Sequence, residues 1–401
     1  MAAEAPATPP ELIDDVIVEI LVRIPPDESA HLVRASLVCK LWRRIILSDA
    51  GDFRRRYREL HRTPPLLGFL HNSCIRRLYR LFFPATMTTT TMAAEASSAS
   101  AFDYGGNRLW WNLDYRNMWA LDCRHGRVLL RHELNFLVWD PITGAQHELH
   151  KPPNMPVVVY CASMVLCATA GCDHCDCHGG PFLIVFVMID DGRAYASVYS
   201  SESRAWSMPV VSAHLGGESD EVDPKRAALA GHDAYFSVRN GAMILKYDLE
   251  KNCLSAIDPP RGYRWNITIM PADDGGSLGL AGIWGCSNLH LWVRKVNNPE
   301  GVGARWVQCR AMELDKLLPI NISGTIARVI GFAEGVGVMF VRVDTSIFMI
   351  ELKSGRVRNV RESAEFHNVL PFMSFYTPGS ASSILPTPME KNNYTGAQIC
   401  S

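Results

Sequence analysis

The chain has 401 residues, of which 48% are hydrophobic and 20% are charged. This length and composition fit a globular protein with one large domain or two to three ordinary ones, and they exclude global disorder. The 40 Lys and Arg residues balance 41 Asp and Glu residues, so no long-range positive field attracts a polyanion or an acidic membrane. We therefore expect neither nucleic acid nor a membrane as a partner.

The N-terminal residues 1–10, "MAAEAPATPP", lack the basic and apolar regions of a secretory signal and are predicted to form a disordered tail. The longest strongly apolar run, 182–189, has about eight residues, whereas a membrane helix needs about 20. The 12 cysteines are scattered rather than framing a small secreted domain, so we expect mostly buried free thiols. A cytoplasmic and/or nuclear protein is expected.

Residues 11–50 carry two helical patterns. The first has apolar residues at intervals of three and four and ends at Pro25-Pro26. The second is predicted as one continuous helix over 30–47, with apolar residues clustered around Trp42. Two short helices carry more apolar surface than they can cover between themselves. They need a partner, either in this chain or outside it.

A basic connector, 51–63, follows. The basic residues here and in the second helix favour a solvated face, or contact with an acidic partner, over nucleic-acid binding, because the chain is neutral and has no DNA-reading motif. They are Lys40, Arg43, Arg44, Arg54, Arg55, Arg56, Arg58 and Arg62. Residues 85–101, rich in Thr, Ala and Ser without a period, predict a flexible loop.

The remainder reads as strands. Five segments repeat the order strand, polar turn and strand: 126–153, 194–211, 242–260, 289–314 and 346–362. Their turns recur about every 50 residues, and a strand-only repeat of that period indicates a β-propeller. We expect about six or seven blades over 64–380, with the loop interrupting the first, and a loose C-terminal tail at 381–401. The predicted class is mainly β, with a small N-terminal helical module.

The segment "CDHCDCHGG", 172–180, is the one metal candidate. It holds Cys172, His174, Cys175, Cys177 and His178. Zinc sites commonly take two ligands from each of two separated knuckles, and no second knuckle follows this one. The sequence therefore favours a metal-free surface loop, with adventitious zinc or copper binding, or oxidation, as the alternatives.

No catalytic residue is predicted. The segment "GGSLG", 275–279, satisfies the Gly-x-Ser-x-Gly pattern of hydrolases, but that motif requires a strand before the serine and a helix after it. Here an acidic, Gly-rich turn leads into a strand, which argues against Ser277 as a nucleophile. No phosphate-binding loop or dinucleotide fingerprint occurs in a strand-to-helix context.

Residues 11–50 resemble the F-box, through "LIDDVIVEILVRIP" and "LVRASLVCKLWRRII". The departure is Ile13, where the family usually has Pro after Leu12. The rest is similar to the kelch-like, F-box-associated propeller of plant F-box proteins, through "LDCRHGRVLL" and "LVWDPITG" followed by "PP". The resemblance implies a nonenzymatic substrate adaptor without a cofactor. Its helices would bind a Skp-family adaptor, and through it a cullin, while its propeller binds a protein target for ubiquitination.

On this resemblance we expect the adaptor-binding residues to lie on the two helical patterns. They are Leu12, Ile13, Val16, Ile20, Leu21, Ile24, Pro25, Leu32, Val38, Cys39, Trp42 and Ile46. Some of them will also pack within the module.

Three alternatives stay open. The helices could pack onto the propeller as ordinary core, since amphipathic helices usually do. The propeller could be an enzyme or could bind a carbohydrate or other small molecule, which would require polar side chains converging at one of its faces. The chain could also bind the adaptor as a scaffold outside the ligase.

Overall fold

The computed structural model describes residues 13–47, 52–73, 83–84, 118–132, 135–153, 161–175, 177–216, 222–223, 227–262, 267–296, 303–322, 324–325, 327–362 and 366–376. The predicted tails, 1–10 and 381–401, and the predicted loop, 85–101, lie outside these residues.

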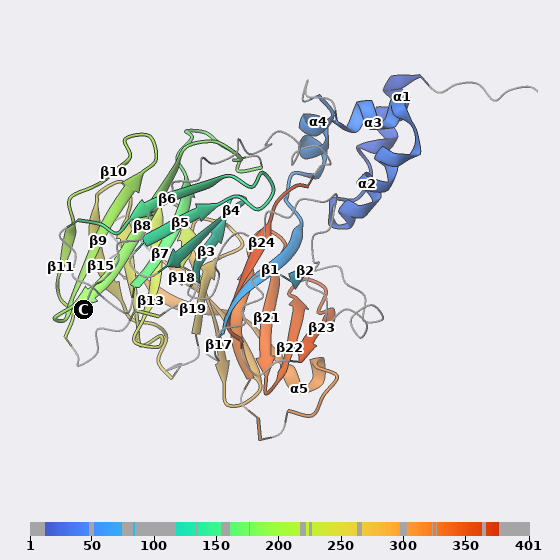
Figure 1. Ribbon diagram of the computed structural model, residues 1–401. Helices are drawn as coiled ribbons and strands as arrows, with labels where there is room; N and C mark the ends of the chain where they lie inside the picture. The colour runs from blue at the N-terminus through green and yellow to red at the C-terminus, as the bar shows by residue number, and fades with distance from the viewer. Residues whose placement is uncertain are drawn as a thin grey trace, which may run out of the picture.

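The N-terminal module is helical (Figure 1). It consists of α1 (Asp14–Leu21), the 3-10 turn η1 (Pro26–Glu28), α2 (Ser29–Val38), α3 (Lys40–Leu47) and α4 (Asp52–His61). The prediction of one continuous helix over 30–47 is wrong, because the helix breaks at Cys39. The Cys39 side chain accepts the backbone N–H of Trp42 at 3.5 Å, and its carbonyl accepts the N–H of Arg43 at 3.0 Å. Cys39 therefore caps a new helix. The basic connector, in turn, is largely helix α4.

Helix α4 is held against the end of α1. Arg56 pairs with Glu19 at 2.5 Å, and the Tyr57 hydroxyl donates to the carbonyl of Ile24 at 2.9 Å. Behind these polar contacts lies a small apolar core. Its buried members are Ile17, Leu21, Val22, Leu32, Ala35, Ile46, Phe53, Tyr57 and, from beyond the last propeller strand, Phe375.

The strands form antiparallel sheets, and in all but one of them the strands follow one another along the chain. The first sheet holds β3 (Met118–Arg124), β4 (Arg127–His132), β5 (Asn135–Trp139) and β6 (Gln146–His150). The second holds β7 (Cys161–Cys167), β8 (Phe182–Asp190), β9 (Arg193–Ser200), β10 (Ala205–Trp206) and β11 (Val210–His214). The third holds β12 (Ala228–Ala230), β13 (Asp233–Val238), β14 (Met243–Asp248) and β15 (Cys253–Ile257).

The fourth sheet holds β16 (Ile267–Pro271), β17 (Leu278–Trp284), β18 (Asn288–Lys295) and β19 (Arg305–Glu313), and the short helix α5 (Leu314–Leu317) follows it. The fifth holds β20 (Ala327–Ala333), β21 (Val338–Val343), β22 (Ser346–Glu351) and β23 (Val357–Glu362). The sixth joins β1 (Leu66–Ser73) and β2 (Phe83–Pro84) to β24 (Phe366–Met373).

This arrangement is a β-propeller, as the repeat predicts. Each of the five predicted hairpin segments supplies outer strands of one sheet, and the intervening apolar segments supply inner strands such as β12 and β20. Within the described residues, five sheets have four or five strands and the sixth has three. The structure thus shows five complete blades. Counting the three-stranded sheet as a sixth blade gives six, the lower of the two predicted numbers.

The ring closes where β1 pairs with β24, from Leu66↔Met373 to Ser73↔Phe366. The Asn72 side chain then mimics a strand: its amide donates to the carbonyl of Ala120 at 2.7 Å, and its oxygen accepts the same residue's N–H at 2.9 Å. At Gly331, on β20, a Cβ atom would come within 2.5 Å of the Val369 carbonyl. Only glycine lets β20 approach β24 this closely.

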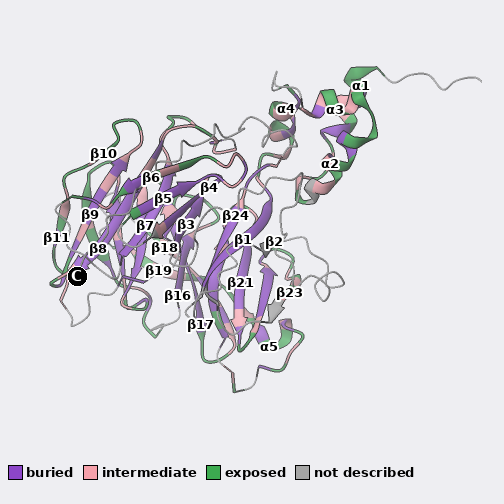
Figure 2. Cartoon of the chain, viewed as in Figure 1, coloured by how far each residue is buried: buried purple, intermediate pink, exposed green. Residues whose placement is uncertain are grey.

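The strands of the propeller are largely buried (Figure 2), and the core clusters combine side chains of adjacent sheets. Phe236 packs with residues of the second and third sheets, and Phe348 with residues of the fourth and fifth. Phe69 and Phe340, whose rings lie 5.3 Å apart, join the sixth sheet to the fifth. Strands buried on both faces, such as β8, explain the continuous apolar run at 182–189.

The helical module lies at one side of the propeller, with α4 next to the ends of β1 and β24 (Figure 1). The Tyr57 ring meets the Phe375 ring edge-on at 6.1 Å, which packs the module's core onto the residues that follow β24. In the part of the chain that the structure describes, no helix has the length and apolar character needed to span a bilayer.

Candidate functional site

The helical module exposes several large apolar side chains. On α1 and the residue before it, the exposed fractions are 68% for Ile13, 38% for Val16 and 47% for Ile20. Their spacing places them on one side of the helix. At the end of α2, Leu37 is 75% and Val38 64% exposed. These five residues are half of the large apolar side chains that are exposed among the described residues. We call them the exposed apolar set.

The predicted adaptor-binding residues divide into two groups. Leu21, Leu32 and Ile46 are fully buried in the module core, so in this structure they build the module and offer no surface to a partner. The exposed predicted residues are Ile13, Val16, Ile20, Pro25, Val38 and Cys39. Ile24 and Trp42 are half-buried against the core, and Leu12 lies outside the described residues.

Leu37 was missing from the predicted set although it is the most exposed of the five. The signal was available, since Leu37 and Val38 are adjacent apolar residues and one helix cannot bury two neighbours equally well on one face. Periodicity did not say which of them faces outward. Both do, because α2 ends there and the chain turns at Cys39.

Several of the basic residues are paired with carboxylates of the module itself. Arg44 contacts Asp14 at 3.1 Å, and Arg55 contacts Asp52 at 2.6 Å and Glu59 at 2.8 Å. These pairs are exposed and so contribute little stability. They nonetheless partly neutralise the positive charge of these arginines. This favours the predicted solvated face over a surface that binds phosphate.

The loop between β7 and β8 brings together four side chains of types that can ligate a metal. The ligand atoms of Cys167, Cys172, His174 and Cys177 all lie within 4.8 Å of one another. The sequence favoured a metal-free loop because no second group of ligands was recognised. Cys167, at the end of β7, supplies the missing ligand: the hairpin returns the loop to its own starting strand.

The other two metal candidates in the loop have different contacts. The Cys175 thiol donates to the carbonyl of Arg62 at 3.1 Å and packs against the helical module. The His178 ring contacts Asp140 Oδ2 through Nδ1 at 2.6 Å and Ser374 Oγ through Nε2 at 3.1 Å. Neither belongs to the cluster of four.

The order Ser374, His178 and Asp140 has the connectivity of a hydrolytic triad. Ser374, however, is only 4% exposed and Asp140 is 6% exposed, so the serine faces packed protein rather than a substrate cleft. Asp140 also accepts the backbone N–H groups of Ile142 and Thr143. The three residues therefore tie a turn of the first sheet, the loop and the chain after β24 to one another.

Burial and hydrogen bonding set the ionisation of this region. Burial raises the pKa of Cys177 and lowers that of His174, which favours the neutral imidazole. For Cys167, burial opposes ionisation, but hydrogen bonds from Thr169 and the neighbouring thiols outweigh it and lower the pKa. Burial also works against the Asp140 carboxylate, yet its bond to His178 holds the pKa below the ordinary value.

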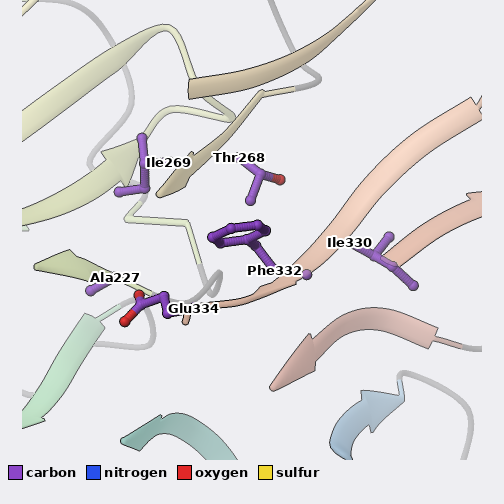
Figure 3. Close-up of a pocket in the computed structure, with 7 residues that line it drawn as sticks. Ala227, Thr268, Ile269, Ile330, Phe332 and Glu334 are labelled. Atoms are coloured by element: carbon purple, nitrogen blue, oxygen red, sulfur yellow. The ribbon is translucent and has the colours of Figure 1, made fainter. Parts of the chain in front are cut away.

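A small pocket at the inner strands offers little for a ligand (Figure 3). Its apolar lining includes Ile269, Ile330 and Phe332, and it has room for about one water molecule. Its charged group, Glu334, accepts two hydrogen bonds from Arg124, at 2.6 and 3.2 Å. A small-molecule site requires polar groups that are available to the ligand.

Ser277 lies on a turn that leads into β17, and its hydroxyl donates a hydrogen bond to Asp274 at 2.8 Å.

The fold and the module define a class, an F-box helical unit joined to a β-propeller. A family model for the F-box domain matches residues 10–53, and one for the beta-propeller of F-box protein AT5G49610-like proteins matches 119–379. The second match covers more than half of the chain, which therefore belongs to the F-box proteins with an AT5G49610-like beta-propeller. F-box domains bind Skp-type adaptors in general. No curated protein matches the chain.

Solved structures give only distant likenesses. The extracellular domain of BT4673 from B. thetaiotaomicron is 14% identical with a TM-score of 0.33, and the match covers 62% of this chain and 28% of that one. Kluyveromyces lactis Hsv2 is 11% identical with a TM-score of 0.37, covering 62% and 66%. The WD40 domain of SCAP from fission yeast is 12% identical with a TM-score of 0.36, covering 64% and 56%. Likeness at this level says nothing about function.

Proposed function

We propose that this protein is the substrate-recognition subunit of a Skp-cullin-F-box ubiquitin ligase. The observation that carries the proposal is the exposed apolar set, which lies on the module that the family match identifies as an F-box. Several exposed apolar residues on one small module are typical of a protein interface. The Skp-family adaptor is the partner that this module would bind, and a cullin would join through it.

The propeller would hold the target. A closed ring of sheets is a rigid platform, and its connecting loops can vary without disturbing the blades. The protein then acts without chemistry of its own: by holding a target near the ligase, it makes ubiquitin transfer by other subunits effectively intramolecular. We accordingly propose a nonenzymatic protein of the cytoplasm and/or nucleus that needs no catalytic cofactor.

The test is binding of the full chain to a purified Skp-family protein, with Ile20→Asp compared against Val211→Asp. Both side chains are 47% exposed, but Ile20 lies on the module and Val211 on the propeller. A charge placed within an interface core typically costs about 2 kcal/mol or more, or roughly 30-fold in affinity. We expect that loss for Ile20→Asp and unchanged affinity for Val211→Asp. Equal affinity of the two variants would reject the interface.

A second measurement separates the ligase subunit from a scaffold. The wild-type chain, bound to its Skp-family partner, is mixed with the cullin, and the complex is sized by chromatography. Recruitment of the cullin supports the ligase assignment. Stable binding of the Skp-family protein without recruitment of the cullin would replace it with the scaffold function.

A further inference from the structure

The four side chains gathered by the β7–β8 loop have the dimensions of a metal site. Cys172 Sγ lies 3.6 Å from Cys177 Sγ, and Cys177 Sγ lies 3.6 Å from His174 Nδ1. In a tetrahedral zinc site, with Zn–S near 2.3 Å and Zn–N near 2.0–2.1 Å, the corresponding edges are about 3.8 Å and about 3.6 Å. All six edges of the cluster are below 4.8 Å, so small side-chain rotations suffice to close it around an ion.

We propose that Cys167, Cys172, His174 and Cys177 bind one zinc ion. Three thiolates and one imidazole form a complete tetrahedral set for zinc, and soft sulfur ligands disfavour magnesium and calcium. Since the four protein ligands leave no open position, the site is structural rather than catalytic. On binding, the thiols release their protons to solvent, which leaves a centre with one net negative charge.

The surroundings of the cluster hold its ligands in place. His125 accepts the backbone N–H of Cys167 at 3.2 Å, and its ring stacks on that of His174 at 3.9 Å. Arg127, which is only 4% exposed, donates from its guanidinium to the carbonyls of Cys177 and Gly180. A buried cation hydrogen-bonded to the backbone of a ligand residue would partly offset the negative charge of the centre. Such supporting contacts are what orient metal ligands.

The position of the loop gives the metal a role. One side of the loop reaches the helical module, through Cys175 and the carbonyl of Arg62. Another side reaches Ser374, through His178, immediately before the Phe375 ring that packs on Tyr57. A zinc ion that fixes the loop would therefore brace the helical module against the propeller. This role does not depend on which protein the module binds.

Metal content tests the site directly. The full chain, purified without added metal and after competition with a weak chelator, is analysed for zinc by mass spectrometry. We expect about one zinc per chain in the wild type and in Cys175→Ser, a cysteine of the same loop outside the cluster. We expect less than a tenth of that in Cys172→Ser and in Cys177→Ser. A metal-free wild type, or full zinc in the cluster variants, would overturn the proposal.

Cobalt titration and exchange of one ligand distinguish loss of the site from loss of metal through misfolding. Tetrahedral Co²⁺ bound by thiolates absorbs visible light, so the apo wild type titrated with Co²⁺ should develop that absorption and lose it to added Zn²⁺. His174→Cys restores four ligands and should retain zinc, whereas His174→Ala should lose it. If His174→Ala and the wild type hold equal zinc, His174 is not a ligand and the proposed set is wrong.

The bracing role has its own readout, amide hydrogen exchange over 52–63 in the wild type with and without zinc. We expect exchange in this segment to rise several-fold when the metal is removed, and to be insensitive to chelator in Cys172→Ser. Unchanged exchange in a wild type that has demonstrably lost its zinc would overturn the brace.

Discussion

The propeller and the helical module differ in how far they bury their apolar residues. In the propeller, each sheet covers the face of the next and the ring closes on itself. Among its described residues, the exposed large apolar ones are Met208 and Val211 near β11, Trp284 at the end of β17, and Val296 after β18. In the module, a small core leaves six such residues exposed among the described residues, namely the exposed apolar set and Leu60 on α4. A closed repeat covers its own core, whereas a short helical unit keeps apolar surface for a partner.

The largest expected effect comes from the buried charge at the propeller's inner strands. The Arg124 side chain is 3% exposed and lies between Asp122, at 3.6 Å, and Glu334, at 2.6 Å. Arg124→Met would leave both carboxylates without their cation, and removing one partner from a buried pair costs about 3–5 kcal/mol of stability. Urea unfolding of the full chain measures this loss.

Arg193→Met is the control for that variant, because Arg193 is exposed on β9. We expect its free energy of unfolding to stay within about 0.5 kcal/mol of the wild type. If the two variants were equally stable, the inner strands would not depend on the buried charges for their stability.

The next effect separates two isoleucines of one helix. Ile17 is 4% exposed in the module core, and Ile20 is 47% exposed three residues later. Ile17→Ala should lower the stability of the module by about 2–5 kcal/mol, since it deletes buried apolar atoms. Ile20→Ala should change it by less than about 0.5 kcal/mol. Thermal unfolding followed by circular dichroism distinguishes them, and equal losses would mean that both residues are core.

A smaller effect is expected where α4 meets α1. Tyr57→Phe removes the hydroxyl that bonds the carbonyl of Ile24 and should cost about 1 kcal/mol. Tyr195→Phe serves as the control, because the half-buried Tyr195 hydroxyl makes no hydrogen bond in the part of the chain that the structure describes. Denaturant midpoints of the two variants give the comparison. A loss no greater for Tyr57→Phe than for Tyr195→Phe would deny the hydrogen bond a stabilising role.

The smallest effect is a dependence on pH at Asp140. Its pKa in the folded chain lies below the ordinary value of about 3.9 for Asp, so the unfolded chain binds the proton more readily. The resulting stability is present above about pH 4 and is lost as the pH falls through the folded pKa. Melting temperatures of wild type and Asp140→Asn should therefore differ most at pH 7 and draw together as the pH falls below about 4. A difference that stays constant over this range would contradict the contribution of the carboxylate.

Much of the fold could be predicted because its strands and helices each carry a characteristic local spacing of apolar residues. Alternating apolar residues and polar turns locate hairpins such as β14–β15, and three-to-four spacing locates α1. The break at Cys39 was not predicted, because the apolar pattern runs through it unchanged. A cysteine side chain that caps the following helix leaves no mark in that pattern.

The candidate sites were harder to predict, since they depend on which apolar residues remain uncovered. Ile17 and Ile20 look alike in the sequence, and only the packing of α4 and Phe375 around one of them tells them apart. Cys167 went unrecognised as a ligand because it belongs to a strand. Its approach to Cys172 and Cys177 follows from the return of the hairpin, which spacing alone does not reveal.

The pairing of β1 with β24 has a consequence for synthesis. Ser73 meets Phe366, so the ring cannot close until nearly all of the propeller has been made. At about 5–20 residues per second, β1 waits roughly 15–60 s on the ribosome for its partner. Throughout that interval the helical module has already emerged, and the unpaired edge of β1 is open to wrong partners. The time before β24 is synthesised, as well as the sequence, therefore influences whether β1 pairs correctly.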